Sequence, residues 1–418
     1  MIEELQQIPN KISLEQLDVS GLSKDKIRDL FRTGKLPTAE GLVDEIILRS
    51  IKEGANDIHF EVGEVELRIR IGQGGIFKKL VYLPKDITEN VINVVKTKAG
   101  MNVFEKKKPQ DGRFSQTFGN HQFDFRASTV PAMFGERIAL RILHKTARVS
   151  SLEELGFSTE NFEKFRLLLK RPNGLLLVTG PSGSGKSTTV YAAVHSLQSS
   201  EKNILTVENP IEYKLDFASQ IQAYPEQSFT YTDALRAILR QNPNVIMIGE
   251  IREPDTAMIA AEAALTGNLV LSTMLSGDAI GTIPRLLNLG ISPFWLASTL
   301  IGVIYQILVR KICEVCKEET AETTEKHAPF FKLLSGQKAF YRGRGCDVCQ
   351  QSGYKGRVAL QEILVIDDRM KDAIYQQVTL LKMKEIAIAS GFDNIYHDAV
   401  SKVSAGITTI AECARVLG

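Results

Sequence analysis

The order of hydrophobic and polar residues predicts two α/β regions in this chain. Residues 42–55 place apolar side chains at helical spacing, and Gly54 is predicted to end that helix. The segments that follow alternate apolar and polar residues, or run apolar between glycines, which is typical of strands. The predicted strands are 57–62, 65–71, 75–83, 112–118, 121–130 and 136–143, with a helix over 91–100 between them. Residues 36–148 are therefore expected to form a compact α/β domain.

A second region, residues 149–310, alternates short apolar runs with helical stretches. Such runs are typical of parallel strands that are buried on both faces. The predicted strands are 175–178, 203–209, 220–224, 244–250 and 268–274, and the predicted helices are 233–240 and 256–265. This order favours a parallel-sheet core.

Two further segments have to be interpreted separately. Residues 1–35 are polar with scattered Leu and Ile, too few for a core, so we expect an N-terminal arm or a short docking helix. Pro293–Val309 is apolar enough to resemble a membrane span, but it is shorter than the roughly 20 residues that a span needs and contains Tyr305 and Gln306. We predict a buried core helix there.

The second region contains a phosphate-binding pattern. Gly180–Ser187 reads GPSGSGKS and fits GxxxxGK[ST], with an apolar strand before it and a helix from Lys186 onward. In this pattern backbone N–H groups hold phosphates, the lysine reaches the β and γ groups, and the serine, here Ser187, binds Mg²⁺. The predicted nucleotide-binding residues are Gly180, Ser182, Gly183, Ser184, Gly185, Lys186, Ser187 and Thr188.

An acidic residue follows another predicted strand of the same region. The apolar run Val245–Ile248 ends at Gly249 and Glu250. An acid at this place, across the sheet from the phosphate loop, coordinates Mg²⁺ or its water in nucleotide hydrolases. Glu250 is therefore the candidate for the Mg²⁺ shell, and ATP with Mg²⁺ is the expected substrate complex.

Composition and charge exclude few classes of function. The chain has 418 residues, 44% hydrophobic and 24% charged, with 51 Lys and Arg against 49 Asp and Glu. Such a balance gives no overall basic field that would favour nucleic acid, and Lys106–Lys108 is interpreted as a solvated loop. The first ten residues lack a signal-peptide pattern, so a cytoplasmic location is expected.

Five cysteines indicate a metal site rather than a disulfide scaffold. Two CxxC pairs, Cys313/Cys316 and Cys346/Cys349, are separated by 29 residues. Four thiolates from two tight turns suit a closed, structural tetrahedral zinc site, and residues 311–358 are the expected zinc-binding insertion. A thioredoxin-like redox motif or unrelated free thiols are the alternatives. Cys413 is expected to be simply buried.

Together these motifs resemble a known family. The phosphate loop, 237–257 (AILRQNPNVIMIGEIREPDTA), 264–273 (ALTGNLVLST), the CxxC pairs and 353–357 (GYKGR) followed by Glu362 are similar to the secretion ATPases of type II secretion and type IV pilus assembly. Residues 55–59 and 109–113 match the family's first domain.

The resemblance implies a fold, an assembly and a location. The fold would be a RecA-like phosphate-loop core with a smaller N-terminal α/β, PAS-like, domain, a zinc knuckle and a helical C-terminal region over 359–418. Six subunits would form a ring that is peripheral to the inner membrane, has no transmembrane span, and uses ATP to drive a platform protein. Arg126 and Arg141 match basic residues that reach toward nucleotide. Compared with the family, the long N-terminal docking domain is expected to be missing or reduced to residues 1–35.

Several positions depart from the family pattern. The usual Glu-Asp-Pro-x-Glu box has Asn209 at its second position, two histidine positions carry Asn268 and Leu275, and an arginine position carries Ile307. Binding of ATP is expected to survive these changes better than hydrolysis, because hydrolysis depends on groups poised near the γ-phosphate.

The retained acids are the candidates for the chemistry. Glu208 is the candidate for polarising the attacking water, with Glu250 at the metal. Asn268 or Ser276 is an alternative source of the hydrogen bond that Leu275 does not make. A further alternative is that these positions do not limit the rate. The departures from the family pattern themselves predict slow basal turnover.

Three functions stay open from the sequence. The first is a hexameric assembly motor for a pseudopilus or pilus, which the zinc knuckle favours over a retraction motor. The second is a structural or regulatory subunit that binds nucleotide but hydrolyses it weakly. The third is a nucleic-acid translocase, which near-neutral charge and the lack of an aromatic-basic stripe disfavour, so no nucleic-acid partner is expected.

Overall fold

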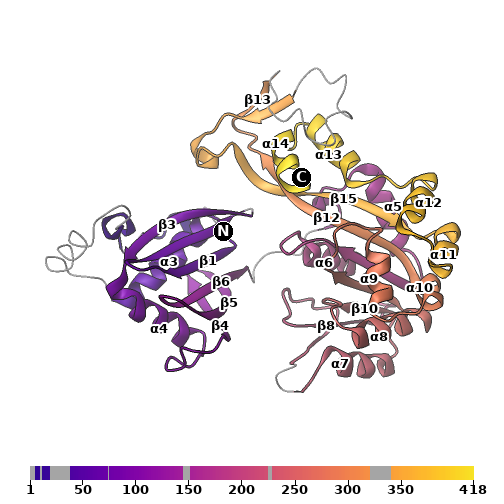
Figure 1. Ribbon diagram of the computed structural model, residues 1–418, viewed down its shortest axis with the longest axis horizontal. Coiled ribbons are helices and arrows are strands. Elements are labelled where there is room, and N and C mark those ends of the chain that lie inside the picture. Colours follow the sequence, from indigo (N-terminus) through magenta and orange to yellow (C-terminus); the bar gives the residue numbers. More distant parts are fainter. Residues whose placement is uncertain are drawn as a thin grey trace. The chain divides into compact units, whose positions relative to one another are not determined.

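The computed structural model describes residues 5–9, 12–18, 38–73, 75–144, 151–224, 228–320 and 340–418. Most of the expected N-terminal arm, residues 1–35, lies outside these ranges. The chain divides into two compact units, Met1–Arg148 and Val149–Gly418. Figure 1 shows the elements of each unit.

The first unit is an antiparallel sheet covered by helices on one face. Its strands β1 to β6 lie in the order β3-β2-β1-β6-β5-β4. Their bounds are β1 Asp57–Val62, β2 Glu66–Gln73, β3 Ile76–Pro84, β4 Gln110–Phe118, β5 His121–Ala132 and β6 Gly135–His144. The helices are α3, Ala39–Lys52, and α4, Thr88–Lys98, with short 3-10 turns at Leu14–Leu17 and Lys85–Ile87.

Alternating side chains explain why only one face of this sheet is covered. Ile58 and Phe60 of β1 are fully buried, whereas their neighbours along the strand are only partly buried. The buried set packs against Ile46 and Ile47 of α3 in one hydrophobic core. A one-sided antiparallel sheet of this kind leaves its second face available to polar side chains.

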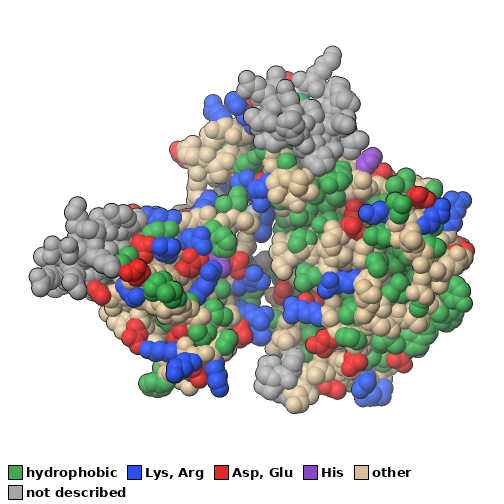
Figure 2. Space-filling view, viewed as in Figure 1, with side chains coloured by type: hydrophobic (Ala, Val, Ile, Leu, Met, Phe, Trp, Pro, Cys, Tyr) green, Lys and Arg blue, Asp and Glu red, His purple; other side chains and the backbone are tan. Residues whose placement is uncertain are grey.

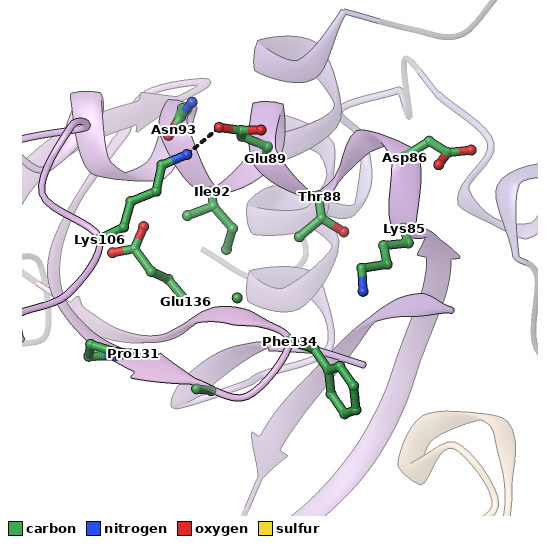
Figure 3. A pocket seen from close by; sticks show the side chains of 12 residues that line it. Lys85, Asp86, Thr88, Glu89, Ile92, Asn93, Lys106, Pro131, Phe134 and Glu136 are labelled. Carbon is green, nitrogen blue, oxygen red and sulfur yellow. Dashed lines mark hydrogen bonds and ion pairs between the residues drawn. The ribbon is translucent and has the colours of Figure 1, made fainter. Parts of the chain in front are cut away.

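A buried ion pair joins α4 to β6. The Lys96 ammonium is fully buried and donates to Glu136 Oε1 at 2.7 Å and to the Glu105 carbonyl at 2.7 Å. Glu136 lines a cavity of about 350 Å³ between the start of α4 and the β5–β6 turn. Figure 3 shows this cavity, with Glu89 and Lys106 forming a second, exposed ion pair above it.

The second unit contains a seven-stranded sheet with helices on both faces. Its order is β15-β12-β7-β11-β10-β8-β9, and only β15 runs antiparallel to its neighbour. The strands are β7 Gly174–Thr179, β8 Ile204–Glu208, β9 Ser219–Gln222, β10 Val245–Ile248, β11 Leu269–Met274, β12 Leu300–Ile312 and β15 Tyr354–Val365. A separate two-stranded sheet pairs β13, Lys317–Thr320, with β14, Phe340–Gly343.

The helices bury both faces of that sheet. Helices α5 and α6 belong to one core, and the other core contains residues of α7, α8 and the C-terminal helices. Their bounds are α5 Thr159–Leu169, α6 Lys186–Ser196, α7 Tyr231–Ile238, α8 Pro254–Leu265, α9 Thr282–Asn288, α10 Pro293–Thr299, α11 Asp368–Tyr375, α12 Leu380–Ala389, α13 Ile395–Ser404 and α14 Ile410–Leu417. The parallel-sheet core with helices on both faces agrees with the predicted fold class.

Two predictions of secondary structure were wrong. Pro293–Val309 is not one core helix, because α10 ends at Thr299 and β12 begins at Leu300. The residues from Leu300 pair with β7 on one side and β15 on the other, a setting in which branched residues such as Val303 and Ile304 pack well. Among the described residues, no helix is long and apolar enough to cross a membrane.

The second error concerns the region expected to be helical from residue 359. Ala359–Val365 belong to β15, and the first helix after them starts at Asp368. These residues are almost all buried, including the polar Gln361 and Glu362, so they show no alternation of buried and exposed positions that would mark a strand in the sequence. The sheet of the second unit therefore extends beyond residue 310.

We predict that the buried pair is essential to the first unit. Lys96→Met would leave the Glu136 carboxylate buried without its cation, so the unfolding free energy should fall by about 3 to 5 kcal/mol. Chemical denaturation of the full chain, followed by hydrogen exchange at amides of α4 and β6, measures this loss.

The exposed pair supplies the control for that experiment. Lys106→Met breaks the contact with Glu89 at the surface and should leave the same amides unchanged. The double variant Lys96→Met, Glu136→Gln should recover much of the loss. Equal protection of the amides in the native chain and the Lys96 variant would contradict the role of the pair.

Candidate functional site

The phosphate loop lies between β7 and α6, where the sequence pattern places it. Gly180 adopts a φ of 144° and Gly185 a φ of 86°, both in a region that favours glycine. A Cβ at Gly180 would lie 2.2 Å from the carbonyl oxygen of Gln306. The loop is therefore closed against β12 at a distance that only glycine allows.

Lys186 begins α6 at the end of this loop. Its ammonium donates to the carbonyls of Gly180 at 3.0 Å and Pro181 at 2.8 Å. Burial lowers the pKa of Lys186 below its usual value, while the Glu250 carboxylate acts in the opposite direction. The charge of the acid after β10 therefore acts on the loop lysine.

The remaining predicted loop residues occupy the same turn. Ser182 and Gly183 are exposed, Ser184 is buried, and Ser187 and Thr188 are half-buried in the first turn of α6. Backbone N–H groups at the start of a helix attract anions, and a serine hydroxyl is a suitable Mg²⁺ ligand. The residues present therefore fit a nucleoside triphosphate with its metal.

Glu208, at the end of β8, is buried, and its carboxylate is hydrogen-bonded on both oxygens. Only 2% of this residue is exposed, and Tyr191 donates its hydroxyl to Oε2. Oε1 accepts from Thr206 Oγ1 at 2.6 Å and from Gln220 Nε2 at 3.1 Å. Both oxygens are thus hydrogen-bonded within the protein, which fixes the position of the side chain.

A second acid of the same segment faces solvent. Glu212 is exposed, and its charge acts on the pKa of Lys186 in the same direction as that of Glu250. The Tyr191 hydroxyl also accepts the backbone N–H of Glu212 at 3.1 Å. Glu208 and Glu212 are therefore linked through one tyrosine, and only Glu212 of the two is exposed.

The two altered histidine positions lie at opposite ends of β11. Met274 pairs with Thr179 beside the phosphate loop, so Leu275 follows at that edge, and 38% of its surface is exposed. Asn268 precedes the strand and donates from Nδ2 to the Ala263 carbonyl at 2.8 Å. A six-residue strand spans about 20 Å, so Asn268 is not an alternative source of the missing hydrogen bond.

The two predicted arginines of the first unit are neighbours on the open face of its sheet. Arg126 lies directly opposite Arg141 across β5 and β6, and Arg113 lies opposite Arg126 across β4 and β5. All three are exposed. Arg141 Nε donates to Asp57 Oδ1 at 2.8 Å. Arg113, Arg126 and Arg141 form an arginine row in which like charges stand directly opposite each other, an arrangement that is destabilising.

The four cysteines of the CxxC pairs form one cluster. Their sulfur atoms all lie within 4.8 Å of one another, and three are buried. Sulfur separations are 3.9 Å for Cys313 and Cys346, 3.8 Å for Cys316 and Cys349, and 3.7 Å for Cys346 and Cys349. A tetrahedral zinc site with bonds of about 2.3 Å places sulfurs about 3.8 Å apart, so the cluster is compatible with zinc. Cys413 is fully buried outside it.

Comparison with known proteins identifies the family. The model described as "Type II/IV secretion system protein" matches residues 33–415. The chain belongs to this family. It is 42% identical to the type II secretion system ATPase E of Vibrio cholerae, over 90% of this chain and 74% of that protein. It is 40% identical to the type IV pilus assembly ATPase PilB of Thermus thermophilus, over 90% of this chain and 42% of that protein.

Solved structures of the family share the fold. The Legionella pneumophila ATPase DotB aligns with a TM-score of 0.68 at 21% identity, covering 92% of this chain and 97% of that one. The pilus retraction motor PilT with bound ADP aligns with a TM-score of 0.61 at 25% identity over the same shares. The chain is thus a secretion or pilus-assembly ATPase, an enzyme that hydrolyses ATP and uses Mg²⁺.

Two residues around the phosphate loop and one on the sheet of the first unit were missed by the sequence analysis. Gln306 borders the phosphate loop, but it lies far along the chain in a run that was interpreted as helix. Glu212 was part of the acidic box, and nothing in the sequence distinguished its exposure from that of Glu208. Arg113 occurs in the motif at 109–113, whose register with Arg126 depends on strand pairing.

We predict that the position of Leu275 limits the rate of hydrolysis. The double variant Asn209→Asp, Leu275→His should hydrolyse ATP faster in a single turnover, by up to about 10²-fold, because an imidazole there adds a donor beside the phosphate loop. Nucleotide affinity should stay the same.

Asn268→His is the matched control, because it restores the other histidine at the far end of β11. Its single-turnover rate should equal that of the native chain. Identical rates for the native chain and the double variant would show that these substitutions are neutral.

Proposed function

We propose that this ATPase is a cytoplasmic motor at the inner membrane that assembles as a hexamer and drives a pseudopilus or pilus through a membrane platform protein. The observation that carries the proposal is the phosphate loop at the carboxyl edge of the sheet, where Lys186 and Glu250 act on each other. The names of the relatives from Vibrio cholerae and Thermus thermophilus support secretion or pilus assembly as the process.

Each residue of the site has a distinct proposed role. Lys186 would offset the charge of the β- and γ-phosphates. Ser187 and Glu250 would hold Mg²⁺, which when bound would supply positive charge at the phosphates. Glu212 orients the attacking water, because it is exposed and its charge acts on Lys186. Glu208, which we expected to polarise that water, instead holds the segment through its hydrogen bonds with Tyr191 and Thr206.

The arginine row of the first unit is the proposed link between nucleotide and movement. Arg126 and Arg141 are directly opposite each other and exposed, so a phosphate that reached them would relieve the repulsion between their charges. On the face drawn in Figure 2, basic and acidic side chains are interspersed over both units. The row is suited to a phosphate group.

A second candidate function rests on Leu275. An aliphatic side chain at the phosphate-loop edge makes no hydrogen bond to a phosphate, so a slowly hydrolysing subunit that regulates the same machinery is the alternative. A large gain in rate for Leu275→His would favour it.

We predict that Lys186→Ala abolishes the proposed motor while leaving the fold intact, since it removes the ammonium without opening a core. The variant should lose ATP turnover and, expressed at the normal level, fail to support secretion or piliation in cells. Glu212→Gln should bind ATP normally and hydrolyse it slowly. Normal secretion or piliation with the lysine variant would refute the motor.

We also propose that the cysteine cluster holds one structural zinc ion. The backbone N–H groups of Cys346 and Gly353 donate to the Cys349 sulfur at 3.2 and 3.3 Å, which stabilises a thiolate there. The cluster closes the end of the β12–β15 hairpin, where Cys313 donates its backbone N–H to the Gly353 carbonyl at 3.0 Å. Four thiolates leave no open coordination position, so the ion has no catalytic role.

Elemental analysis of the purified chain should find about one zinc per subunit. Replacing Cys316 or Cys349 with Ser should release the metal and lower the melting temperature, because the segment has little core of its own. Cys413→Ala is the control and should retain the zinc. A metal-free protein that melts like the native chain would exclude a structural ion.

A further inference from the structure

Gln306 of β12 makes two side-chain hydrogen bonds under the phosphate loop. The residue is 1% exposed. Its Nε2 donates to the Ser184 carbonyl at 2.8 Å, and its Oε1 accepts from Thr189 Oγ1 at 2.8 Å. One amide therefore contacts both the loop and the helix that follows it.

The backbone of the same residue also shapes the loop. The Gln306 carbonyl oxygen lies 2.2 Å from the place that a Cβ at Gly180 would take, and its Nε2 lies 3.2 Å from that at Gly185. Gln306 is thus next to both ends of the loop. The strand pairing fixes it there, because the preceding residue, Tyr305, pairs with Thr179 at the end of β7.

We propose that Gln306 is a positioning residue that sets the shape of the phosphate loop and so the affinity for nucleotide. The inference rests on the proposed role of the loop as the nucleotide site. Backbone N–H groups hold a phosphate only when they converge, and Ser184 belongs to the turn that aims them. A side-chain amide suits this place because it donates and accepts at once, whereas a carboxylate only accepts.

The neighbouring strand provides a matched control. Gln361 of β15 lies directly opposite Gln306 in the register and is also 1% exposed. Neither polar atom of its side chain has a hydrogen-bond partner. Replacing Gln361 with Met removes a buried amide of the same size from the same hairpin without touching the loop. Any general effect of losing a buried glutamine appears in both variants.

The test measures the affinity of the full chain for Mg·ADP and for Mg·ATPγS, well below the melting temperature. Gln306→Met leaves the Ser184 carbonyl and the Thr189 hydroxyl without their partner, and we expect about ten- to one-hundred-fold weaker binding. Gln306→Glu keeps the acceptor and loses the donor, and it should bind weakly as well. Thr189→Val should have a smaller effect, since it removes only one of the two bonds.

Several outcomes distinguish this inference from the proposed function. Native affinity in the Gln306→Met and Gln306→Glu variants, alongside a Lys186→Ala variant that loses turnover, would overturn the positioning role alone. Equal losses of affinity for Gln306→Met and Gln361→Met would also overturn it, because the hairpin and not the contact would then be responsible. A native chain that binds neither nucleotide would overturn the proposed function and the inference together.

Discussion

The pairing of β7 with a parallel strand on each side is the constraint on which the second unit depends. Leu175–Val178 are at most 2% exposed, so their backbone groups have to find partners within the sheet. Pairing with β11 and β12 satisfies them and brings the carboxyl ends of parallel strands to one edge. The phosphate loop, Glu208, Glu250 and Leu275 follow those ends, as binding sites in open parallel sheets do.

Burial divides the ionisable groups into structural and functional sets. Glu208 and Lys96 are buried with several hydrogen bonds and hold segments together. Glu362 belongs with them, because it accepts the backbone N–H groups of Ala279 and Ile395 at 2.7 and 2.8 Å, joining the loop after β11 to α13. Burial raises the pKa of Glu362 to about 7, against the effect of these donors. Glu212 and the three arginines Arg113, Arg126 and Arg141 are exposed instead.

The β12–β15 hairpin connects features that are distant in the sequence. Gln306, near its start, contacts the phosphate loop, and Glu362 lies opposite Tyr305 and holds the loop after β11. The cysteine cluster closes the far end of the same hairpin. A metal ion that fixes this end would make β12 and β15 more rigid. Because these strands border the nucleotide site, a structural zinc ion would support that site.

The sequence by itself determined the strands and helices of the first unit, the phosphate loop, Glu250 and the cysteine cluster, because periodicity and local spacing carry these features. It did not determine that residues 300–312 form a strand, since a doubly buried strand and a buried helix have the same apolar composition. Only tertiary pairing placed Gln306 under the loop, enclosed Glu208 and moved Asn268 away from the site. These features depend on which strands become neighbours, and the hydrophobic pattern of one segment does not show which other strand it will pair with.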